Sequence, residues 1–212
     1  MAHQIYKVDG KRVPSVTTIL SRFKEYGGLI QWAYKCGCDG IDINEVKQDA
    51  ATAGTIVHKM VESDIRGIPG PKKDIYESSV WDKALTGFSA YIEWKKQTNL
   101  TPTKTELGLV CACHSYGGCL DSVSINSKRS LLDWKCSNGI YGEYLCQLAA
   151  YGHLHNVNFP GEQIDGGYHL VRFGKEDGSF HHSWYPDLSV PWTAFVLMRE
   201  LYDIDKKIKG MV

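Results

Sequence analysis

Apolar residues in the first half of the chain recur at helical spacing and predict two long helices. The first covers residues 48–66 and is ended by Gly67 and Pro69, and the second covers residues 77–96. The apolar positions are Ile56, Val57, Met60, Val61 and Ile65 in the first, and Trp81, Leu85, Phe88 and Ile92 in the second. Each helix therefore has one face suited to a core.

Two shorter helices are expected before these. The segment SVTTILSRF, residues 15–23, follows Pro14, and Ser15 is a residue type that caps helix N-termini. A short stretch over residues 29–34 predicts the next helix. Residues 1–100 are therefore expected to be a helical N-terminal part.

After Pro102 the pattern changes to that of β-strands. Strands are predicted over residues 105–113, 118–125 and 130–136, with hairpin turns at YGG (116–118) and NSK (126–128). A helix over 141–157, a hairpin of strands 167–173 and 180–185, and a helix over 191–208 follow. This order predicts a mixed α/β (α+β) fold, in which helices flank a central mixed sheet. At 212 residues, the parts 1–100 and 101–212 are expected to form one compact domain.

The composition is that of an ordinary globular protein. The chain has 24 Lys+Arg against 24 Asp+Glu, and this zero net charge argues against a general nucleic-acid binder while leaving room for a local basic channel. The lysines at 95–96 and 206–209 fall at predicted helix C-termini, where cations offset the helix dipole.

The sequence also predicts the compartment. No run of 18 apolar residues occurs, so no contact with a membrane is expected, and the opening MAHQIYKVDGK lacks the apolar run of a signal peptide. We therefore expect a cytoplasmic protein, not a secreted one, with its seven cysteines as free thiols.

The segment LLDWKCS, residues 131–137, contains the most informative chemistry. Asp133 and Lys135 lie two apart in a predicted strand and share a face, while Trp134 points the other way. In the preceding strand, GGCLDSV places Asp121 among similar apolar neighbours. Two carboxylates brought together favour a divalent cation. An Asp–Lys cross-strand pair on a solvated face remains the alternative.

The predicted helix after this strand adds a polar face. Gln147 and Tyr151 lie four residues apart, with Tyr144 on the same side. Such a face suits a phosphate backbone and nucleobases. Ordinary packing of an amphipathic helix with polar edges explains the same pattern.

These motifs, taken in order, resemble the RecB-type branch of the PD-(D/E)XK nucleases. The motifs are GGCLDSV, LLDWKCS and CQLAAY, preceded by ATAGTIVHKMVE, which is similar to that branch's histidine-bearing helix. With the opening VPSVTTIL, the chain looks most like mitochondrial genome maintenance exonucleases and their phage-encoded relatives. The resemblance covers roughly residues 13–155 and implies a restriction-endonuclease-like core over 101–212.

The resemblance also implies roles for individual residues. Asp121, Asp133, His58 and the Trp134 carbonyl would hold Mg²⁺ or Mn²⁺, and Lys135 would act on the attacking water and on transition-state charge. A single histidine on a helix is by default structural, so His58 keeps that alternative. Glu106 matches an acidic position beside the metal, but a solvent-facing strand residue would look the same.

The DNA contacts that the resemblance implies come from two helices. Gln147, Tyr151 and Tyr144 would position the DNA. Hydroxyls of Ser15, Thr17 and Thr18 could contact the DNA backbone, although capping explains Ser15 equally well.

Two other metal centres are not expected. The iron–sulfur cluster of some RecB-type nucleases needs late cysteines, and none follows Cys146. Zinc is not expected either, because Cys111 and Cys113 fall in one predicted strand without a chelate loop, so that core packing explains them better. The chain also departs from its relatives at Cys136, where they carry Thr or Ser.

The function expected is a metal-dependent DNA exonuclease acting on single strands or DNA ends. The partners expected are DNA and, from the resemblance, other replication or recombination proteins. A structure-specific flap or branch endonuclease is the nearest alternative. A catalytically silent module that binds nucleic acid or protein is the alternative from another class.

Overall fold

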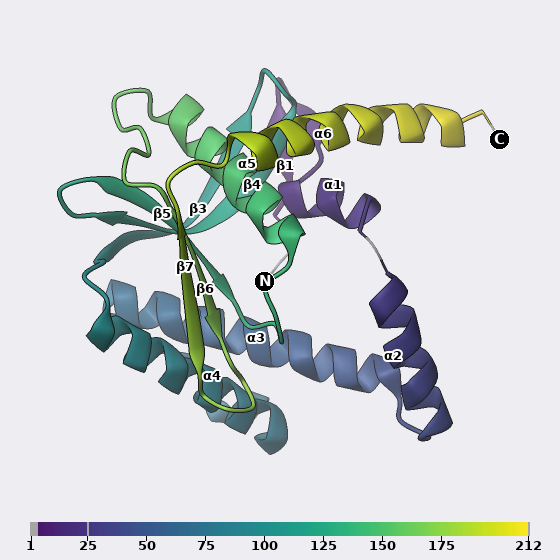
Figure 1. Ribbon diagram of the computed structural model, residues 1–212, viewed down its shortest axis with the longest axis vertical. Coiled ribbons are helices and arrows are strands. Elements are labelled where there is room, and N and C mark those ends of the chain that lie inside the picture. Colours follow the sequence, from purple (N-terminus) through teal and green to yellow (C-terminus); the bar gives the residue numbers. More distant parts are fainter. Residues whose placement is uncertain (1–3, 25, 212) are drawn as a thin grey trace.

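A five-stranded mixed sheet forms the centre of the protein (Figure 1). The computed structural model describes residues 4–24 and 26–211. The strand order is β3-β4-β5-β6-β7, and only β5 and β6 run parallel. The strands are β3 Pro102–Cys111, β4 Tyr116–Ile125, β5 Arg129–Lys135, β6 Tyr168–Phe173 and β7 Phe180–Tyr185.

Helices cover both faces of the sheet and enclose two hydrophobic cores. In Figure 1, α5 and α6 lie above the strands and α3 and α4 lie below them. Leu131 of β5 belongs to the core on the α5 side, whereas its neighbour Leu132 belongs to the core on the α3–α4 side. This alternation follows from the two-residue period of a strand. The helices are α1 Val16–Arg22, α2 Gly27–Cys38, α3 Ile43–Arg66, α4 Ser78–Gln97, α5 Gly142–Asn158 and α6 Ser189–Lys209, with a short 3₁₀ helix at Lys73–Ile75.

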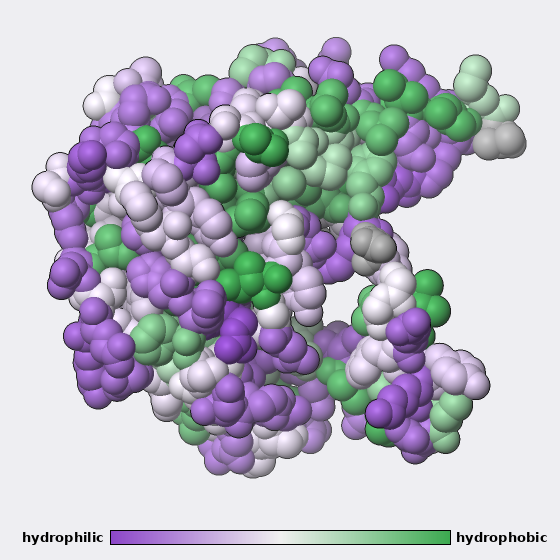
Figure 2. All heavy atoms as spheres, viewed as in Figure 1, coloured by the Kyte–Doolittle hydropathy of each residue, from purple (hydrophilic) through white to green (hydrophobic). Residues whose placement is uncertain are grey.

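The expected fold class is confirmed. The architecture is a mixed α/β domain whose central sheet is flanked by helices, consistent with a restriction-endonuclease-like core, and the first four helices precede that sheet in the chain. No helix in the described part of the chain is long and apolar enough to cross a membrane. Figure 2 shows apolar side chains gathered along α6, where Leu197 and Ile208 are exposed.

Several boundaries differ from the sequence prediction, among them the first hairpin turn and the start of α3. The first hairpin of the sheet turns at residues 112–115 rather than 116–118, so that Gly117 and Gly118 lie inside β4. The turn uses Ser115 with a positive φ of 51°, and no glycine is needed there. The helix α3 begins at Ile43, five residues before its expected start at 48, because Asp42 caps it by accepting a hydrogen bond from the Asn44 N–H at 2.8 Å.

A small hairpin that was not predicted lies at the start of the described chain. Strands β1 Tyr6–Val8 and β2 Lys11–Val13 pair through a turn at Asp9-Gly10, where φ is 49° and 76°. An Asp-Gly pair with both φ angles positive is the turn that short β-hairpins favour. The sequence signal was therefore present, although the flanking strands are only three residues long.

Candidate functional site

Three carboxylates lie in one row across β3, β4 and β5. The register of β3 with β4 places Glu106 opposite Asp121. Asp121 and Asp133 lie opposite each other one residue beyond Ser122 and Leu132, where the pairing of β4 with β5 ends. Residues opposite each other on neighbouring strands have Cβ atoms about 5 Å apart. The sheet therefore brings together acidic residues that are up to 27 positions apart in the sequence.

The backbone departs from regular sheet geometry at this row. The Trp134 N–H donates to Asp121 Oδ2 at 2.8 Å, so a side chain accepts the hydrogen bond where a regular ladder would offer a carbonyl. Glu106 has a φ of 52°, a left-handed conformation that costs a residue with a side chain some free energy. Both irregularities occur where β4 and β5 cease to pair, at the carboxylates of the site.

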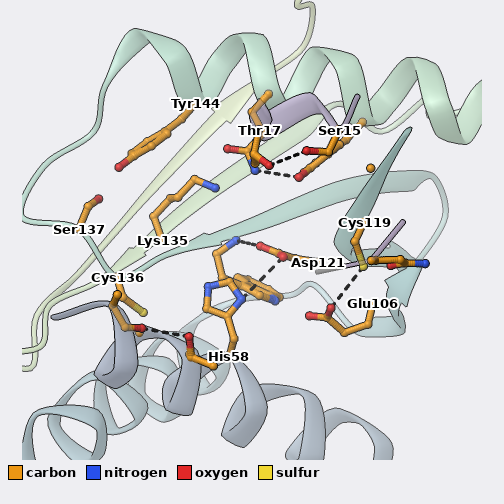
Figure 3. Close-up of a pocket in the computed structure, with 18 of the residues that line it drawn as sticks. Ser15, Thr17, His58, Glu106, Cys119, Asp121, Lys135, Cys136, Ser137 and Tyr144 are labelled. Atoms are coloured by element: carbon orange, nitrogen blue, oxygen red, sulfur yellow. Dashed lines mark hydrogen bonds and ion pairs between the residues drawn. The ribbon is translucent and has the colours of Figure 1, made fainter. Parts of the chain in front are cut away.

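His58 of α3 completes a group of possible metal ligands. One ligand atom each from His58, Glu106 and Asp121 lies within 4.8 Å of the others, and His58 Nδ1 is 3.7 Å from Asp121 Oδ1 (Figure 3). Burial, reinforced by the charge of Lys135, lowers the pKa of His58 to about 4. The imidazole is therefore neutral near pH 7, which is the form that binds metal ions.

Asp133 lies outside that group and is paired with Lys135. The Lys135 Nζ is 2.5 Å from Asp133 Oδ2, and the Asp133 side chain is fully buried. Burial raises the pKa of Asp133 to about 6, although the nearby ammonium opposes the rise. For Lys135, burial would lower the pKa, but Asp133 and Asp121 outweigh burial and raise it, so the ammonium stays charged. A solvated cross-strand pair is thus excluded.

Several buried polar atoms at the site have no hydrogen-bond partner among the described residues. They are both carboxylate oxygens of Asp133, whose contact with Lys135 is an ion pair, and Nδ1 of His58. Orphaned oxygens and an imidazole nitrogen at a site of negative charge fit a hard or borderline divalent cation such as Mg²⁺ or Mn²⁺. Burial and the charge of Asp121 raise the pKa of Glu106 to about 7, which a bound cation would reverse.

The polar face of α5 lies beside these residues as expected. The Gln147 Nε2 donates to the Tyr151 hydroxyl at 3.0 Å, and the Lys135 Nζ is 4.9 Å from the centre of the Tyr144 ring. Tyr151 is only 5% exposed, so its ring does not offer a stacking face and its hydroxyl instead orients Gln147. The ring packs on Gly118, where an added Cβ would come within 2.7 Å of Tyr151 Cε1.

An open cavity of about 850 Å³ adjoins the site, and the fully buried Asp133 lies behind its wall. Its walls include His58, Glu106, Asp121, Trp134, Lys135, Tyr144, Gln147 and Tyr151, together with Ser15 and Thr17. Thr18 does not line it. Ser15 caps α1 by accepting a hydrogen bond from the Thr18 N–H at 3.0 Å, so the capping role expected for Ser15 is confirmed.

The sequence analysis missed Lys175 as a wall of this cavity. It follows β6, is half-buried and donates from Nζ to the Ala50 carbonyl at 2.8 Å. Burial lowers the pKa of this ammonium. No local pattern identifies this lysine, since it reaches the site only through the hydrogen bond that joins the residue after β6 to Ala50 of α3.

Comparisons with known proteins find matches among solved structures. No family model matches the chain, and no curated protein matches it. Among solved structures, LHK-Exo in complex with dAMP is 15% identical with a TM-score of 0.37, over 74% of this chain and 85% of that one. A second LHK-Exo structure, an alkaline exonuclease from Laribacter hongkongensis, is 14% identical with a TM-score of 0.35, over 74% and 84%.

A third similar structure, the protein SSO0001, is 17% identical with a TM-score of 0.33, over 58% of each chain. At these identities and TM-scores the likenesses carry no argument about the activity of this chain.

Proposed function

We propose that this protein is a metal-dependent deoxyribonuclease, and more narrowly an exonuclease acting on single-stranded DNA or on DNA ends. The observation that carries the proposal is the position of Asp121 opposite the buried Asp133 at the end of their strand pairing, with Asp121 and Lys135 lining an open cavity. Two carboxylates and a lysine in one place suit phosphodiester hydrolysis by water.

The cation would be Mg²⁺ or Mn²⁺, held by Asp121, Asp133, His58 and the Trp134 carbonyl, with Glu106 at its edge. A bound divalent ion supplies a more acidic water and positive charge beside the phosphate. The protein's own part falls to Lys135, whose ammonium would leave Asp133 to orient the attacking water and to offset charge on the phosphate oxygens. The centre of the Tyr144 ring lies 4.9 Å from that ammonium, within the range of a cation–π contact.

DNA would enter across the wall formed by α1, α5 and the β6–β7 hairpin. Gln147 and Tyr144 are available to a phosphate or base, and Ser15 and Thr17 present hydroxyls. Lys175 adds a second ammonium to this wall, which would be available to a phosphate.

The test uses the wild type and Lys135→Ala with DNA labelled at either end, single- and double-stranded, in Mg²⁺, Mn²⁺ or EDTA. Lys128→Ala, an exposed lysine in the β4–β5 turn, is the matched control. We expect metal-dependent loss of label by the wild type and by Lys128→Ala, and none by Lys135→Ala. Equal loss of label with all three proteins would indicate a contaminating nuclease and contradict the role proposed for Lys135.

A covalently closed circular single strand separates the narrower proposals. An exonuclease leaves the circle intact and degrades its linearised form to mononucleotides and short oligomers. Cutting of the circle, or defined internal cuts in flap substrates, would favour an endonuclease. Binding without cleavage in Mn²⁺ would overturn the nuclease proposal in favour of a binding module.

A further inference from the structure

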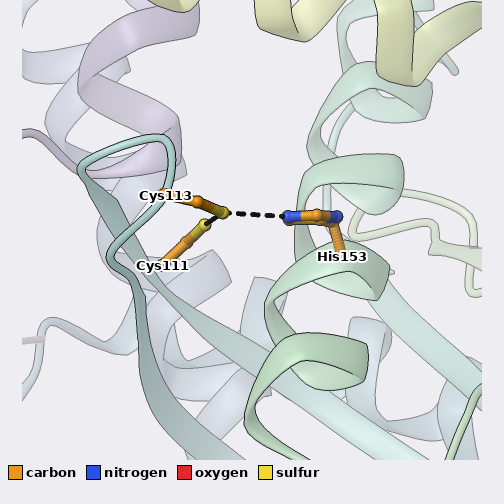
Figure 4. Close-up of side chains that lie close together, drawn as sticks. All are labelled: Cys111, Cys113 and His153. Atoms are coloured by element: carbon orange, nitrogen blue, oxygen red, sulfur yellow. Dashed lines mark hydrogen bonds between the residues drawn. The ribbon is translucent and has the colours of Figure 1, made fainter. Parts of the chain in front are cut away.

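Two cysteines and a histidine meet at the end of the sheet away from the cavity. Cys111 Sγ and Cys113 Sγ are 3.1 Å apart, and Cys113 Sγ is 3.9 Å from His153 Nε2 (Figure 4). One ligand atom of each residue lies within 4.8 Å of the others. Cys111 is five residues beyond Glu106 along β3, about 17 Å at the rise of a strand. None of the three lines the large cavity.

The chain brings the thiols together through a turn. The sequence argument against zinc placed both cysteines in one strand, where a C-x-C pair forms no chelate loop. That premise is wrong, because β3 ends at Cys111 and Cys113 lies in the turn of residues 112–115. The turn curls back and points both thiols toward His153 of α5 (Figure 4).

Core packing accounts for only one of the two thiols. Cys111 is fully buried, whereas Cys113 is exposed. The sulfur separation of 3.1 Å is also well beyond a disulfide bond of about 2.05 Å, so the thiols are free. An exposed thiol that is turned toward a second thiol and an imidazole therefore needs another explanation.

The surrounding residues hold this arrangement in place. The buried Arg199 of α6 donates from Nε to the carbonyls of His114 and Ser115, at 3.0 and 3.2 Å, and so fixes the turn that carries Cys113. Asn158 of α5 donates to the Val110 carbonyl at 2.9 Å and fixes the end of β3.

The imidazole of His153 is oriented as well. Its ring stacks on Trp192 with centroids 4.1 Å apart and an interplanar angle of 20°. The ring of His114 lies against it at 5.4 Å. Such packing sets the direction of Nε2, as neighbouring groups do for histidines that bind metals.

The distances are close to those of a thiolate–imidazole metal site. Zinc–sulfur bonds of about 2.3 Å and a zinc–nitrogen bond of about 2.0 Å, at tetrahedral angles, separate two sulfurs by about 3.8 Å and a sulfur from the nitrogen by about 3.5 Å. The observed sulfur separation of 3.1 Å is shorter than the first value, and the observed sulfur–nitrogen distance of 3.9 Å is longer than the second. To receive an ion, the sulfurs would move apart by about 0.7 Å, and Cys113 Sγ and His153 Nε2 would approach by about 0.4 Å.

We propose that Cys111, Cys113 and His153 bind one thiophilic transition-metal ion, with Zn²⁺ as the representative species, separate from the candidate nuclease site. On binding, the two thiols release their protons to solvent and the neutral imidazole donates the lone pair of Nε2. Water completes the coordination. The ion joins the β3–β4 hairpin to α5, so its effect is to stabilise the fold.

Cobalt is the probe that distinguishes this site from the carboxylate site. Reduced protein is titrated with Co²⁺ and then with Zn²⁺, while the thiolate-to-cobalt charge-transfer absorption in the near ultraviolet is followed. Asp121, Asp133, His58 and Glu106 contribute no sulfur, and a band from Cys119, which lies 3.3 Å from Glu106, would persist in Cys113→Ser. Asp121→Asn, titrated in parallel, is expected to give the same band as the wild type.

The variants are Cys113→Ser and His153→Gln, with the exposed Cys38→Ser as the matched control. We expect the band to saturate at one ion per chain in the wild type and in Cys38→Ser, to be displaced by Zn²⁺, and to be lost in Cys113→Ser. His153→Gln should bind at least about tenfold more weakly. Zn²⁺ should raise the Tm of the wild type and leave that of Cys113→Ser unchanged.

Absence of the band in the reduced wild type overturns the proposal. So does a band that persists unchanged in both variants, or a Cys111–Cys113 disulfide recovered by mass spectrometry under the same reducing conditions. The metal-free Tm and circular dichroism of each variant confirm that it is folded. Because one test reads sulfur ligation and the other DNA cleavage, this proposal and the proposed function succeed or fail independently.

Discussion

The backbone N–H of Trp134 donates a hydrogen bond to Asp121 Oδ2 at 2.8 Å. The Asp121 side chain thereby replaces a main-chain carbonyl as the hydrogen-bond acceptor for β5, at the position where β4 and β5 cease to pair. The contact orients one carboxylate oxygen and leaves Oδ1 facing His58 at 3.7 Å. A residue expected to be a metal ligand therefore also takes part in the hydrogen bonding of the sheet.

Asp121→Asn should separate function from stability. Asparagine keeps an oxygen that can accept from Trp134, but it removes the charge that a cation needs. Burial raises the pKa of Asp121, so the ionised form costs stability above the pKa of the unfolded chain, and the neutral amide avoids that cost at pH 7.

We therefore expect cleavage in Mn²⁺ to fall by at least about 100-fold while the Tm is unchanged or higher. Activity assays and thermal unfolding of the same preparation provide the check. Asp82→Asn, an exposed aspartate on α4, is the control. A large fall in Tm for Asp121→Asn alone would show that the carboxylate is structural.

Lys135→Met should destabilise the protein by leaving Asp133 without its partner. Breaking a buried ion pair from one side costs about 3 kcal/mol in the free energy of unfolding, because the remaining charge is buried and uncompensated. Asp133→Asn combined with Lys135→Met removes both charges and should recover most of that loss. Denaturant unfolding of both single variants and the double variant measures this coupling. A double variant less stable than Lys135→Met contradicts the explanation.

Stability should fall in acid because of the pair His169 and His182. Trp94 Nε1 donates to His182 Nδ1 at 3.2 Å, and His182 Nε2 lies 2.8 Å from His169 Nδ1, so both rings are held neutral. Burial, followed by the proximity of His182, lowers the pKa of His169 to about 4. The unfolded chain therefore binds the proton more strongly, and stability present above pH 6.5 is lost as the pH falls toward 4.

His169→Gln should reduce this loss by on the order of 2 kcal/mol, with allowance for partial solvent screening. The measurement is the difference between variant and wild type in denaturant unfolding from pH 7 to pH 4. The difference between the two proteins is needed because the pKa of His58 is also lowered, so that His58 also costs stability in acid. His181→Gln, at an exposed neighbour on β7, should follow the wild type. Parallel curves for wild type and His169→Gln would rule out the pair as the cause.

Gly118→Ala should disturb the site through Tyr151. The added Cβ would lie 2.7 Å from Cε1 of that buried ring, which leaves the ring no room. Overpacking of this kind costs about 1–3 kcal/mol and would displace the hydroxyl that orients Gln147. We expect a lower Tm together with reduced cleavage.

Gly142→Ala is the control for this substitution. Gly142 begins α5 and has no atom within 4 Å of an added Cβ, so alanine there should be neutral or stabilising by up to about 1 kcal/mol. Unfolding curves and initial rates are compared for the two variants. An unchanged Tm in Gly118→Ala would mean that the Tyr151 ring can move aside, which would contradict its close packing on Gly118.

The sequence predicted the central row of the site well, because that row depends on short-range patterns. Two-residue alternation placed Asp133 and Lys135 on one face of β5 and Trp134 in the opposite core, as the structure shows. The succession of hydrophobic strands with short turns also implied that Asp121 and Asp133 would be neighbours. Helices α4, α5 and α6 were predicted to within two residues for the same reason.

Tertiary structure alone decided which distant groups reach these residues. The nearness of His58 to Asp121 and of Lys175 to the cavity depends on how α3 packs on the sheet, and no local periodicity records that packing. The meeting of Cys111 and Cys113 with His153 depends on a turn fixed by Arg199, 84 residues away along the chain. The repeat of side-chain direction along a strand or helix depends only on the local backbone geometry, so the sequence reveals it. These contacts depend on long-range packing, which only the folded chain specifies.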